Sequence, residues 1–503
     1  MWEREIGPVR LSVEHRAVGG DRGGTLCIRE RTPEARERLR FDCFEVGPHF
    51  HYDPPGRNEI TRLVPDEDPI AWTVGELGRD FEGYLKRAGL EVARPLDRAE
   101  LAAVLEAAEA ELRCPAPDLD GIDVDALRRR QGEKWRLYGD DVLAAWVADM
   151  DFPVAEPIQR AFRDLVRRND FGYPVNPAVP GLPTLFCERM ERRFGWKPEP
   201  RLVEVMTDVV QGIFVALRQF ADPGEGAVVQ TPIYPPFLGA LGATGRRLVE
   251  NPLVPGPERF ELDLDGLRAA IDAGTRILLF CNPHNPSGRA FTRAELERVA
   301  EVALERDLIV VSDEIHADLV YSGHAHVPFA TLSPEVEART VTLTSATKAF
   351  NVAGMRCSVA AFGSPELKRR FLSGPDARHV HGGANTTGML AMQMAWRHSQ
   401  PWLDRVVHYL EANRDFLSRF VAERMPGVVC RAAEATYLAW LDCSALDIEG
   451  GPHEFFLQRA KVGLSDGATF GTPGQGCVRL NFATSRAILT EILERMARAL
   501  DER

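Results

Sequence analysis

The chain has 503 residues, of which 45% are hydrophobic and 27% charged, a composition that is typical of globular proteins and excludes a disordered, collagen-like or coiled-coil chain. The formal net charge of -13 argues against nucleic acid or an anionic membrane as the main partner. No stretch approaches the ~18 uninterrupted apolar residues of a membrane span, and residues 1–15 lack the apolar core of a signal peptide. We therefore expect a soluble, cytoplasmic protein. Nine scattered cysteines without a CxxC pair predict reduced thiols.

The amino-terminal region is rich in Gly, Pro and Arg, with short alternating stretches at residues 9–13 and 39–46 that indicate a few short strands. His49 and His51 are two residues apart and would share one face of a strand, with Cys43 nearby, so a metal site is one interpretation. We favour the other, in which polar side chains line a small sheet or its contact with the rest of the chain. No carboxylate stands at a recognisable ligand spacing, and we expect no metal.

A helix is expected over residues 97–113, because Asp97 can cap it and Glu100 occupies the capping-box position. It ends at residues 114–121, whose two prolines and glycine are typical of a linker. These elements predict a small α+β accessory domain over residues 1–115, which resembles no family that we can name.

Beyond the linker, amphipathic stretches alternate with short apolar runs. The helical stretches lie at residues 154–168, 210–221 and 292–306, and the apolar runs at 226–230, 276–281 and 308–313. This alternation is typical of an α/β fold with a buried, mostly parallel sheet, whose active groups lie at the carboxyl ends of the strands. From Trp402 onward, a smaller α+β lobe is expected. Its helices are expected at 402–424, 453–462 and 486–501, and its strands at 437–442 and 477–483.

The most informative segment is TSATKAFNVAGMR, residues 344–356. Lys348 follows Ser-Ala-Thr where a strand gives way to a loop, and Arg356 lies eight residues later. This pattern predicts a pyridoxal phosphate (PLP) site, in which the lysine amine forms an imine with the cofactor while Ser345 and Arg356 bind its phosphate.

Four other segments fit the same ligand. The turn after residue 281 presents Asn282 and Asn285, and the next strand ends with Asp313, whose carboxylate would need a buried cation such as a protonated pyridine nitrogen. Tyr234 follows another strand and could stack on a flat ring. Residues 207–217 open a helix, and a helix N-terminus is a ready phosphate site.

From about residue 122 to 503, the sequence resembles the fold-type I PLP enzymes of the class I/II aminotransferase superfamily, and within it the branch of cystathionine β-lyases and cysteine-S-conjugate β-lyases. The phrases that carry the closer match are WVADMDF, CNPHNPSG, SDEIHADL, SATKAFNVAG, EATYLAWLD, GLSDGATFG and VRLNFA. The resemblance implies a large PLP-binding domain over residues 166–389, with a mostly parallel sheet flanked by helices. It implies a small α+β domain made of residues 122–165 and 390–503.

The resemblance also implies a role for each matched residue. Lys348 would be the imine lysine, Asp313 would contact the ring nitrogen and Asn285 the ring hydroxyl. His316 falls near that hydroxyl, where many aminotransferases have a tyrosine, and Tyr234 would stack on the ring.

The remaining roles concern phosphate and substrate. The phosphate contacts fall on the backbone of Val209 and Val210, on Ser345 and Arg356, and on Tyr173. Tyr173 would come from the other subunit, which implies a homodimer with active sites at the subunit interface. Arg479 would pair with the substrate α-carboxylate. One departure is Asp208, which stands where this branch usually has glycine, and its carboxylate would repel a phosphate unless it points away.

The resemblance implies a PLP-dependent carbon–sulfur β-lyase. Lys348 would remove the Cα proton of a cysteine thioether, either cystathionine or a cysteine S-conjugate, and a thiolate would leave from Cβ, giving thiol, pyruvate and ammonia. Three alternatives stay open: an aminotransferase, a biosynthetic variant that decarboxylates or oxidatively deaminates its amino acid, and a regulatory protein whose PLP site is vestigial.

Overall fold

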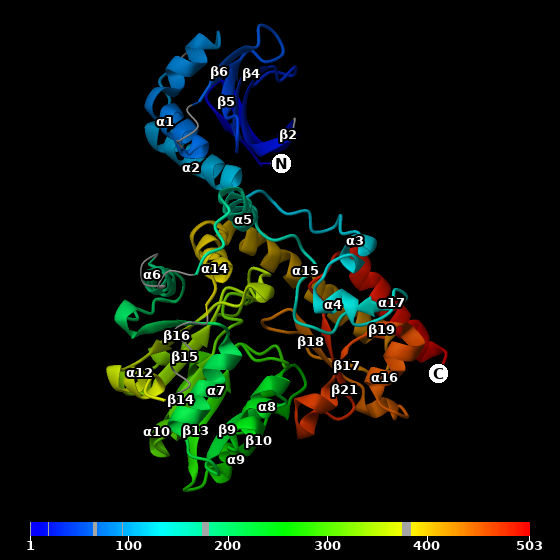
Figure 1. Cartoon of the computed structure of the whole chain (residues 1–503). Coiled ribbons are helices and arrows are strands. Elements are labelled where there is room, and N and C mark those ends of the chain that lie inside the picture. The colour runs from blue at the N-terminus through cyan, green and yellow to red at the C-terminus, as the bar shows by residue number, and fades with distance from the viewer. Residues whose placement is uncertain (1, 19, 64–67, 93, 174–180, 375–383) are drawn as a thin grey trace. The chain divides into compact units, whose positions relative to one another are not determined.

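The computed structural model describes residues 2–18, 20–63, 68–92, 94–173, 181–374 and 384–503. The chain divides into two compact units (Figure 1). The first unit comprises Met1–Pro117 with Ala155–Arg160 and His398–Trp402, and the second comprises the remainder of the chain. No helix in these described ranges is both long enough and apolar enough to cross a bilayer.

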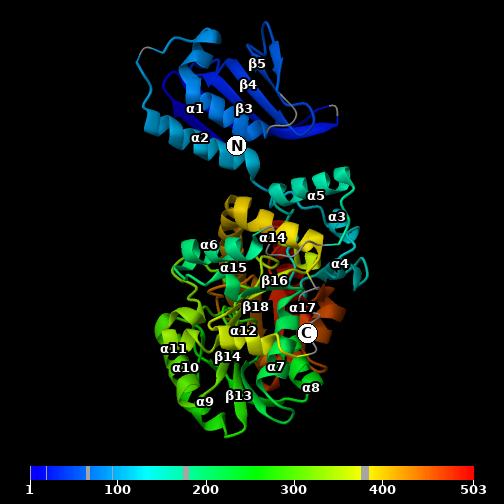
Figure 2. The ribbon, with the colours of Figure 1, turned by 60° about the vertical axis from the view of Figure 1, so that its left-hand side comes forward.

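The first unit is built on a six-stranded antiparallel sheet in which each strand pairs with the next along the chain. Its strands are β1 (Trp2–Ile6), β2 (Val9–Val18), β3 (Asp21–Glu30), β4 (Glu37–Phe44), β5 (His49–Tyr52) and β6 (Glu59–Arg62). Two helices, α1 (Pro69–Arg87) and α2 (Arg98–Arg113), pack together against it (Figure 2). Leu11, Leu26 and Phe41 of the sheet form one apolar core with Leu77 and Leu105 of these helices, so one face of the sheet is apolar.

The caps of these helices explain one prediction that was right and one element that was missed. Asp97 caps α2, as predicted, by accepting from the N–H groups of Ala99 and Glu100. Helix α1 lies in a region where we expected only short strands. Three glycines lower its helix propensity, but Asp68 caps it and its apolar residues are buried against the sheet, and this packing outweighs propensity.

Cys43, which the less favoured metal-site interpretation placed beside the two histidines, does not share their face of the sheet. Successive residues of a strand point to opposite faces, and Cys43 faces the apolar core, where its Sγ lies 3.5 Å from Thr73 Oγ1. The neighbouring residue Asp42 instead shares a face with His49 and His51.

The second unit contains a seven-stranded sheet in the order β10-β9-β13-β14-β15-β16-β8. Its strands are β8 (Val203–Met206), β9 (Gly226–Thr231), β10 (Arg247–Pro252), β13 (Thr275–Cys281), β14 (Ile309–Asp313), β15 (Thr340–Thr344) and β16 (Ser358–Phe362). The pairs from β10 to β15 are parallel, and β16 is antiparallel to both of its neighbours. This is the mostly parallel sheet that the sequence predicts.

Helices cover both faces of this sheet. One apolar cluster joins it to α7 (Val209–Phe220), α8 (Pro235–Thr244) and α12 (Pro365–Phe371). The other joins it to α9 (Leu264–Ala270) and α10 (Arg293–Glu305). Neighbouring residues of β13 divide between the two clusters, with Leu279 in the first and Leu278 in the second, because side chains alternate along a strand.

The carboxyl-terminal part adds a four-stranded antiparallel sheet in the order β17-β18-β21-β20. These strands are β17 (Val429–Cys430), β18 (Leu438–Asp442), β20 (Ser465–Asp466) and β21 (Cys477–Asn481), accompanied by the long helices α15 (Gln400–Arg424) and α17 (Arg486–Asp501). The helix expected over residues 453–462 is shorter: α16 (Pro452–Phe455) continues as a π-helical turn to Ala460, and Lys461 has a positive φ that ends it. The division of this unit into a large and a small domain stays a prediction.

Shorter elements complete the second unit and its connections. They are α3 (Val124–Arg128), α4 (Glu133–Arg136), β7 (Leu143–Ala144), α5 (Glu156–Arg168), α6 (Leu182–Phe194), β11 (Val254–Pro255), β12 (Phe260–Glu261), α11 (Pro334–Glu337), α14 (Thr386–His398) and β19 (Val462–Gly463).

Candidate active site

A cavity of about 370 Å³ lies in the second unit, among residues that follow the carboxyl ends of the parallel strands. Tyr234 follows β9, Asn285 follows β13, Asp313 ends β14, and Lys348 follows β15. Of the residues predicted from sequence, those that line the cavity are Val209, Val210, Tyr234, Asn285, Asp313, His316, Ser345, Lys348 and Arg356.

The Lys348 amine is held at the wall of the cavity by a backbone oxygen. Its Nζ donates to the Ala148 carbonyl oxygen over 2.9 Å. Burial lowers the pKa of Lys348, and the charge of Arg479 lowers it further, while Asp149 and Asp313 act in the opposite direction. A larger share of this amine is therefore neutral near pH 7 than for an exposed lysine, as a nucleophile or a proton acceptor requires.

The segment that supplies Ala148, residues 146–152, is fixed by side chains from three other parts of the unit. Tyr437 Oη donates to the Ala148 carbonyl oxygen at 2.8 Å. Asn481 Nδ2 donates to the carbonyl oxygens on either side, at 2.7 Å each, and Asn351 Nδ2 binds the Met150 and Phe152 carbonyl oxygens. These contacts explain the WVADMDF segment in structural terms: they fix the backbone to which the Lys348 amine is hydrogen-bonded. Tyr437, Asn351 and Asn481 were missed, although each lies in or beside a phrase that carried the resemblance.

Asp313 and His316 are buried polar groups whose ionisation is strongly shifted. Burial raises the pKa of the Asp313 carboxyl to about 7, although one of its oxygens accepts from the Ile315 N–H at 3.0 Å. Burial, with the charges of Lys348 and Arg479, lowers the pKa of His316 to about 3, so its imidazole is neutral. Within the described ranges, His316 Nδ1 has no hydrogen-bond partner. The carboxyl would be stabilised by a buried cation, and the imidazole by a polar ligand atom.

Arg479 is a buried cation beside the cavity. Its Nη1 donates to Asn285 Oδ1 at 3.0 Å, and its Nη2 donates to the Trp146 carbonyl oxygen at 2.9 Å and to Ser465 Oγ at 3.1 Å. Burial lowers the pKa of Arg479 to about 10. Among the residues that the structure describes, no carboxylate forms an ion pair with it, and its Nε has no partner. A buried guanidinium of this kind favours an anionic ligand.

The N-terminus of α7 forms another wall of the cavity. Asp208 is its N-cap, accepts from the Gln211 N–H at 2.7 Å and is among the residues that line the cavity. Arg356 Nη2 lies 3.6 Å from Asp208 Oδ2, which offsets part of the negative charge. Ser345 Oγ lies 2.6 Å from the Cys357 carbonyl oxygen.

Two predicted residues lie elsewhere. Tyr173 is fully exposed and does not line the cavity. Asn282, which we expected to face a ligand, is buried and uses its Oδ1 to accept from the Phe291 N–H at 3.1 Å, so that expectation is wrong. Cys281 and Cys357 line the cavity, but burial raises the pKa of Cys357 to about 12 and that of Cys281 well above its usual value, so both stay thiols, as expected.

Comparison with known proteins places these residues in a family. The model of aminotransferase class I and II matches residues 149–496. The chain belongs to this family.

Among the relatives, the cystathionine β-lyase PatB of Bacillus subtilis is 36% identical over 379 residues, which cover 74% of this chain and 97% of PatB. The crystal structure of OvoB is 40% identical, with a TM-score of 0.72 over 76% of this chain and 99% of OvoB. The PLP-bound C–S lyase of Staphylococcus hominis is 28% identical, with a TM-score of 0.71 over 77% and 99% of the two chains. Residues 4–112 match a separate model, described as a domain of unknown function, DUF7700.

This aminotransferase-family enzyme depends on PLP, and the residues of the cavity fit that cofactor. The raised pKa of Asp313 suits a carboxylate that is completed by a protonated ring nitrogen, and the unpartnered Nδ1 of His316 suits a polar atom of the ring. The Lys348 amine reaches the cavity with its pKa lowered, as a group that must attack a carbonyl requires.

Proposed function

We propose that this aminotransferase-family enzyme is a PLP-dependent carbon–sulfur β-lyase that cleaves a cysteine thioether, cystathionine or a cysteine S-conjugate. The observation that carries the proposal is the convergence of Lys348, Asp313 and Asn285 on one cavity, with the buried guanidinium of Arg479 bonded to Asn285. A proton acceptor, an anchor for the cofactor ring and a receptor for a carboxylate are thus close together. The relatives named as cystathionine β-lyase and C–S lyase support the choice of reaction.

Arg479 would bind the substrate α-carboxylate and so orient the amino acid, while Asn285, which accepts from Arg479, would contact the ring hydroxyl of the cofactor. The guanidinium is held by Trp146 and Ser465, and a fixed donor pair can grip a carboxylate in one plane. Its burial strengthens the attraction for an anion, because little water competes.

Lys348 would remove the Cα proton. Its amine is directed by the Ala148 carbonyl, and its lowered pKa leaves a lone pair available near neutral pH. Bound PLP supplies the electron sink that accepts the pair left at Cα. Asp313 would keep the ring nitrogen protonated by remaining ionised beside it. The C–S bond then breaks with the electron pair on sulfur, and with one water the products are thiol, pyruvate and ammonium.

We also propose that the enzyme is a homodimer whose subunits share their active sites. Tyr173 is fully exposed in a single chain, and the resemblance assigns it to the cofactor phosphate of the partner subunit. Phosphate would otherwise be bound by the backbone of Val209 and Val210, by Ser345 and by Arg356. Sedimentation of the holoenzyme should give twice the 55.9 kDa chain mass, and Tyr173→Phe should weaken retention of the cofactor without changing that mass.

The activity is tested by incubating the purified holoenzyme with cystathionine and several S-alkylcysteines and measuring thiol and pyruvate together. We expect equal amounts of both. L-Alanine, which lacks a leaving group, serves as the comparison, because an aminotransferase would convert it to pyruvate once per cofactor and change the cofactor absorbance. Conversion of alanine without release of thiol from any thioether would contradict the proposal.

A further inference from the structure

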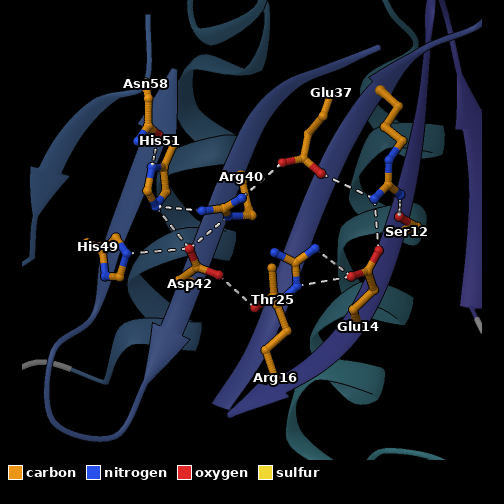
Figure 3. Close-up of polar contacts among 11 residues, drawn as sticks. Ser12, Glu14, Arg16, Thr25, Glu37, Arg40, Asp42, His49, His51 and Asn58 are labelled. Atoms are coloured by element: carbon orange, nitrogen blue, oxygen red, sulfur yellow. Dashed lines mark hydrogen bonds and ion pairs between the residues drawn. The ribbon is translucent and has the colours of Figure 1, made fainter. Parts of the chain in front are cut away.

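The sheet of the first unit carries a compact polar cluster on the face opposite its apolar core (Figure 3). On β4 and β5, Asp42 pairs with His49, and Arg40 pairs with His51. Directly opposed residues of antiparallel strands point to the same face, so the four side chains form a square block. Figure 3 shows both imidazoles directed at the Asp42 carboxylate. Asp42 and His51 are almost completely buried, while the His49 side chain keeps 23% of its exposure.

Hydrogen bonds fix the tautomer of each imidazole. His49 Nδ1 lies 2.7 Å from the Gly47 carbonyl oxygen, which can only accept, so Nδ1 carries a proton. His51 Nε2 lies 2.9 Å from the Arg40 guanidinium, which can only donate, so this Nε2 carries a lone pair. The proton of His51 is then on Nδ1, which donates to Asn58 Oδ1 at 2.6 Å. Neutral His49 and His51 therefore both present the Nε2 lone pair.

These lone pairs converge on a third acceptor. Asp42 Oδ2 lies 3.1 Å from His51 Nε2 and 3.5 Å from His49 Nε2, while Asp42 Oδ1 accepts from Thr25 Oγ1 at 2.8 Å. The potential ligand atoms of the three residues all lie within 4.8 Å of one another. Acceptors placed so closely need a cation between them.

We propose that Asp42, His49 and His51 bind a divalent transition-metal ion. Two imidazoles and one carboxylate form the ligand set that suits first-row ions such as Fe²⁺, Co²⁺, Ni²⁺ and Zn²⁺. Each ligand is oriented by a second bond: His49 by Gly47, His51 by Asn58, and Asp42 by Thr25. Such outer contacts are typical of metal-binding histidines and carboxylates. The exposed edge of His49 leaves open coordination positions for water or a small ligand.

In this structure, the Arg40 guanidinium is the cation that contacts Asp42 and His51, and Glu37 is its alternative partner. Its Nε donates to Asp42 Oδ2 at 2.9 Å, and its Nη1 lies 3.3 Å from Glu37 Oε1. A metal ion would replace the guanidinium between Asp42 and His51, and Arg40 would keep Glu37 as its partner. Arg40 therefore competes with the metal, and its removal should tighten metal binding.

The test uses the full-length holoenzyme, freed of metal with a chelator, dialysed, and titrated with Co²⁺ and with Zn²⁺ by calorimetry, with metal content measured after gel filtration. We expect one ion per chain and visible absorption from bound Co²⁺. His49→Ala and His51→Ala should each weaken binding by about 100-fold or more, and Asn58→Ala by about 10- to 100-fold. His324→Ala, at an exposed histidine outside the cluster, should bind as the unaltered protein does.

Arg40→Gln separates a metal site from an ion-pair network. A metal site predicts tighter binding of Co²⁺ in this variant, by about tenfold, since a competing charge is gone. If His51→Ala fails to fold, the half-buried His49 provides the decisive variant, with circular dichroism as the check on folding. The proposal is overturned if the unaltered protein retains no ion, if His49→Ala binds as tightly, or if Arg40→Gln binds less tightly.

Discussion

The two main sheets of the molecule place their polar residues in different ways. In the seven-stranded sheet, Asp313 and Lys348 stand at or just beyond the carboxyl ends of parallel strands, and the bodies of these strands are almost entirely buried. In the six-stranded sheet, Asp42 and His51 stand within antiparallel strands, on a face opposite the apolar core. In the first arrangement, the functional residues gather at the carboxyl ends of the strands, and each lies within a short sequence motif. The second builds a cluster from cross-strand pairs, which depend on register.

The largest effect is expected for Lys348→Ala. Loss of the amine removes both the attachment of the cofactor and the proton acceptor, so kcat for thioether cleavage should fall by at least about 10³-fold. Borohydride treatment should no longer join the cofactor to the chain, as intact-mass measurement would show. Metal binding in the first unit should be unchanged, since the two sites use separate residues.

The exposed Lys197 supplies the control for this variant. Lys197→Ala should keep full activity and full attachment of cofactor. If Lys348→Ala kept more than about a tenth of the activity of the natural enzyme, Lys348 would not be the group that removes the Cα proton. A positioned proton acceptor raises the rate by at least about 100-fold.

A smaller loss is expected for Arg479→Lys. A lysine keeps the charge but cannot donate to Asn285, Trp146 and a substrate carboxylate in one plane, so kcat/KM should fall by about 10²-fold, mainly through KM. Steady-state kinetics would measure this fall. Arg369→Lys serves as the control, because Arg369 lies in an exposed ion pair with Glu366. A change confined to kcat would indicate that Arg479 acts elsewhere than on the carboxylate.

Asp313 makes a pH-dependent prediction for the cofactor-free enzyme. Its folded pKa of about 7 lies above the 3.8 of an unperturbed Asp, so the folded state holds the proton more tightly. The stability it contributes is present below about pH 4 and is lost as pH rises through 7. The unfolding free energy of the natural protein relative to Asp313→Asn should thus fall with pH over this window, by at most about 1.4 kcal/mol per pH unit.

Urea unfolding of both cofactor-free proteins between pH 4.5 and 8 would measure this difference, and taking the difference cancels the opposite contribution of His316, whose pKa is lowered. Parallel curves for the two proteins would show that the Asp313 carboxyl titrates normally.

The smallest effect concerns Asp208. An asparagine in its place would still cap α7, but the negative charge beside the proposed phosphate position would be gone, so Asp208→Asn should bind PLP about fivefold more tightly. Fluorescence titration of the cofactor-free protein measures this, with the fully exposed Asp265→Asn as the control. Weaker binding would mean that Asp208 supports the cofactor through Arg356, its partner at 3.6 Å.

The sequence allowed the parallel sheet and most of the cavity to be predicted, because Asn285, Asp313 and Lys348 each lie within a few residues of a strand end and inside a recognisable phrase. Tyr437 and Asn481 were missed because they act on backbone carbonyls far away in the chain, and no local pattern marks such contacts.

The first unit was harder to predict for the same reason. Asp42 and His49 become partners only through the register of the β4–β5 hairpin, and the sequence alone places Cys43 no farther from the histidines than Asp42. Helix α1 was not predicted because its three glycines lower its helix propensity, whereas packing against the sheet stabilises it. A capping aspartate followed by proline, Asp68 and Pro69, was the signal available for its start.

The proposed reaction is tested most directly by one measurement: release of thiol and pyruvate from cystathionine by the purified holoenzyme, compared with Lys348→Ala. We predict equal amounts of thiol and pyruvate from the natural enzyme, and loss of both in the variant. Absence of both products from the natural enzyme across cystathionine and a panel of S-alkylcysteines, with PLP bound, would contradict a carbon–sulfur β-lyase.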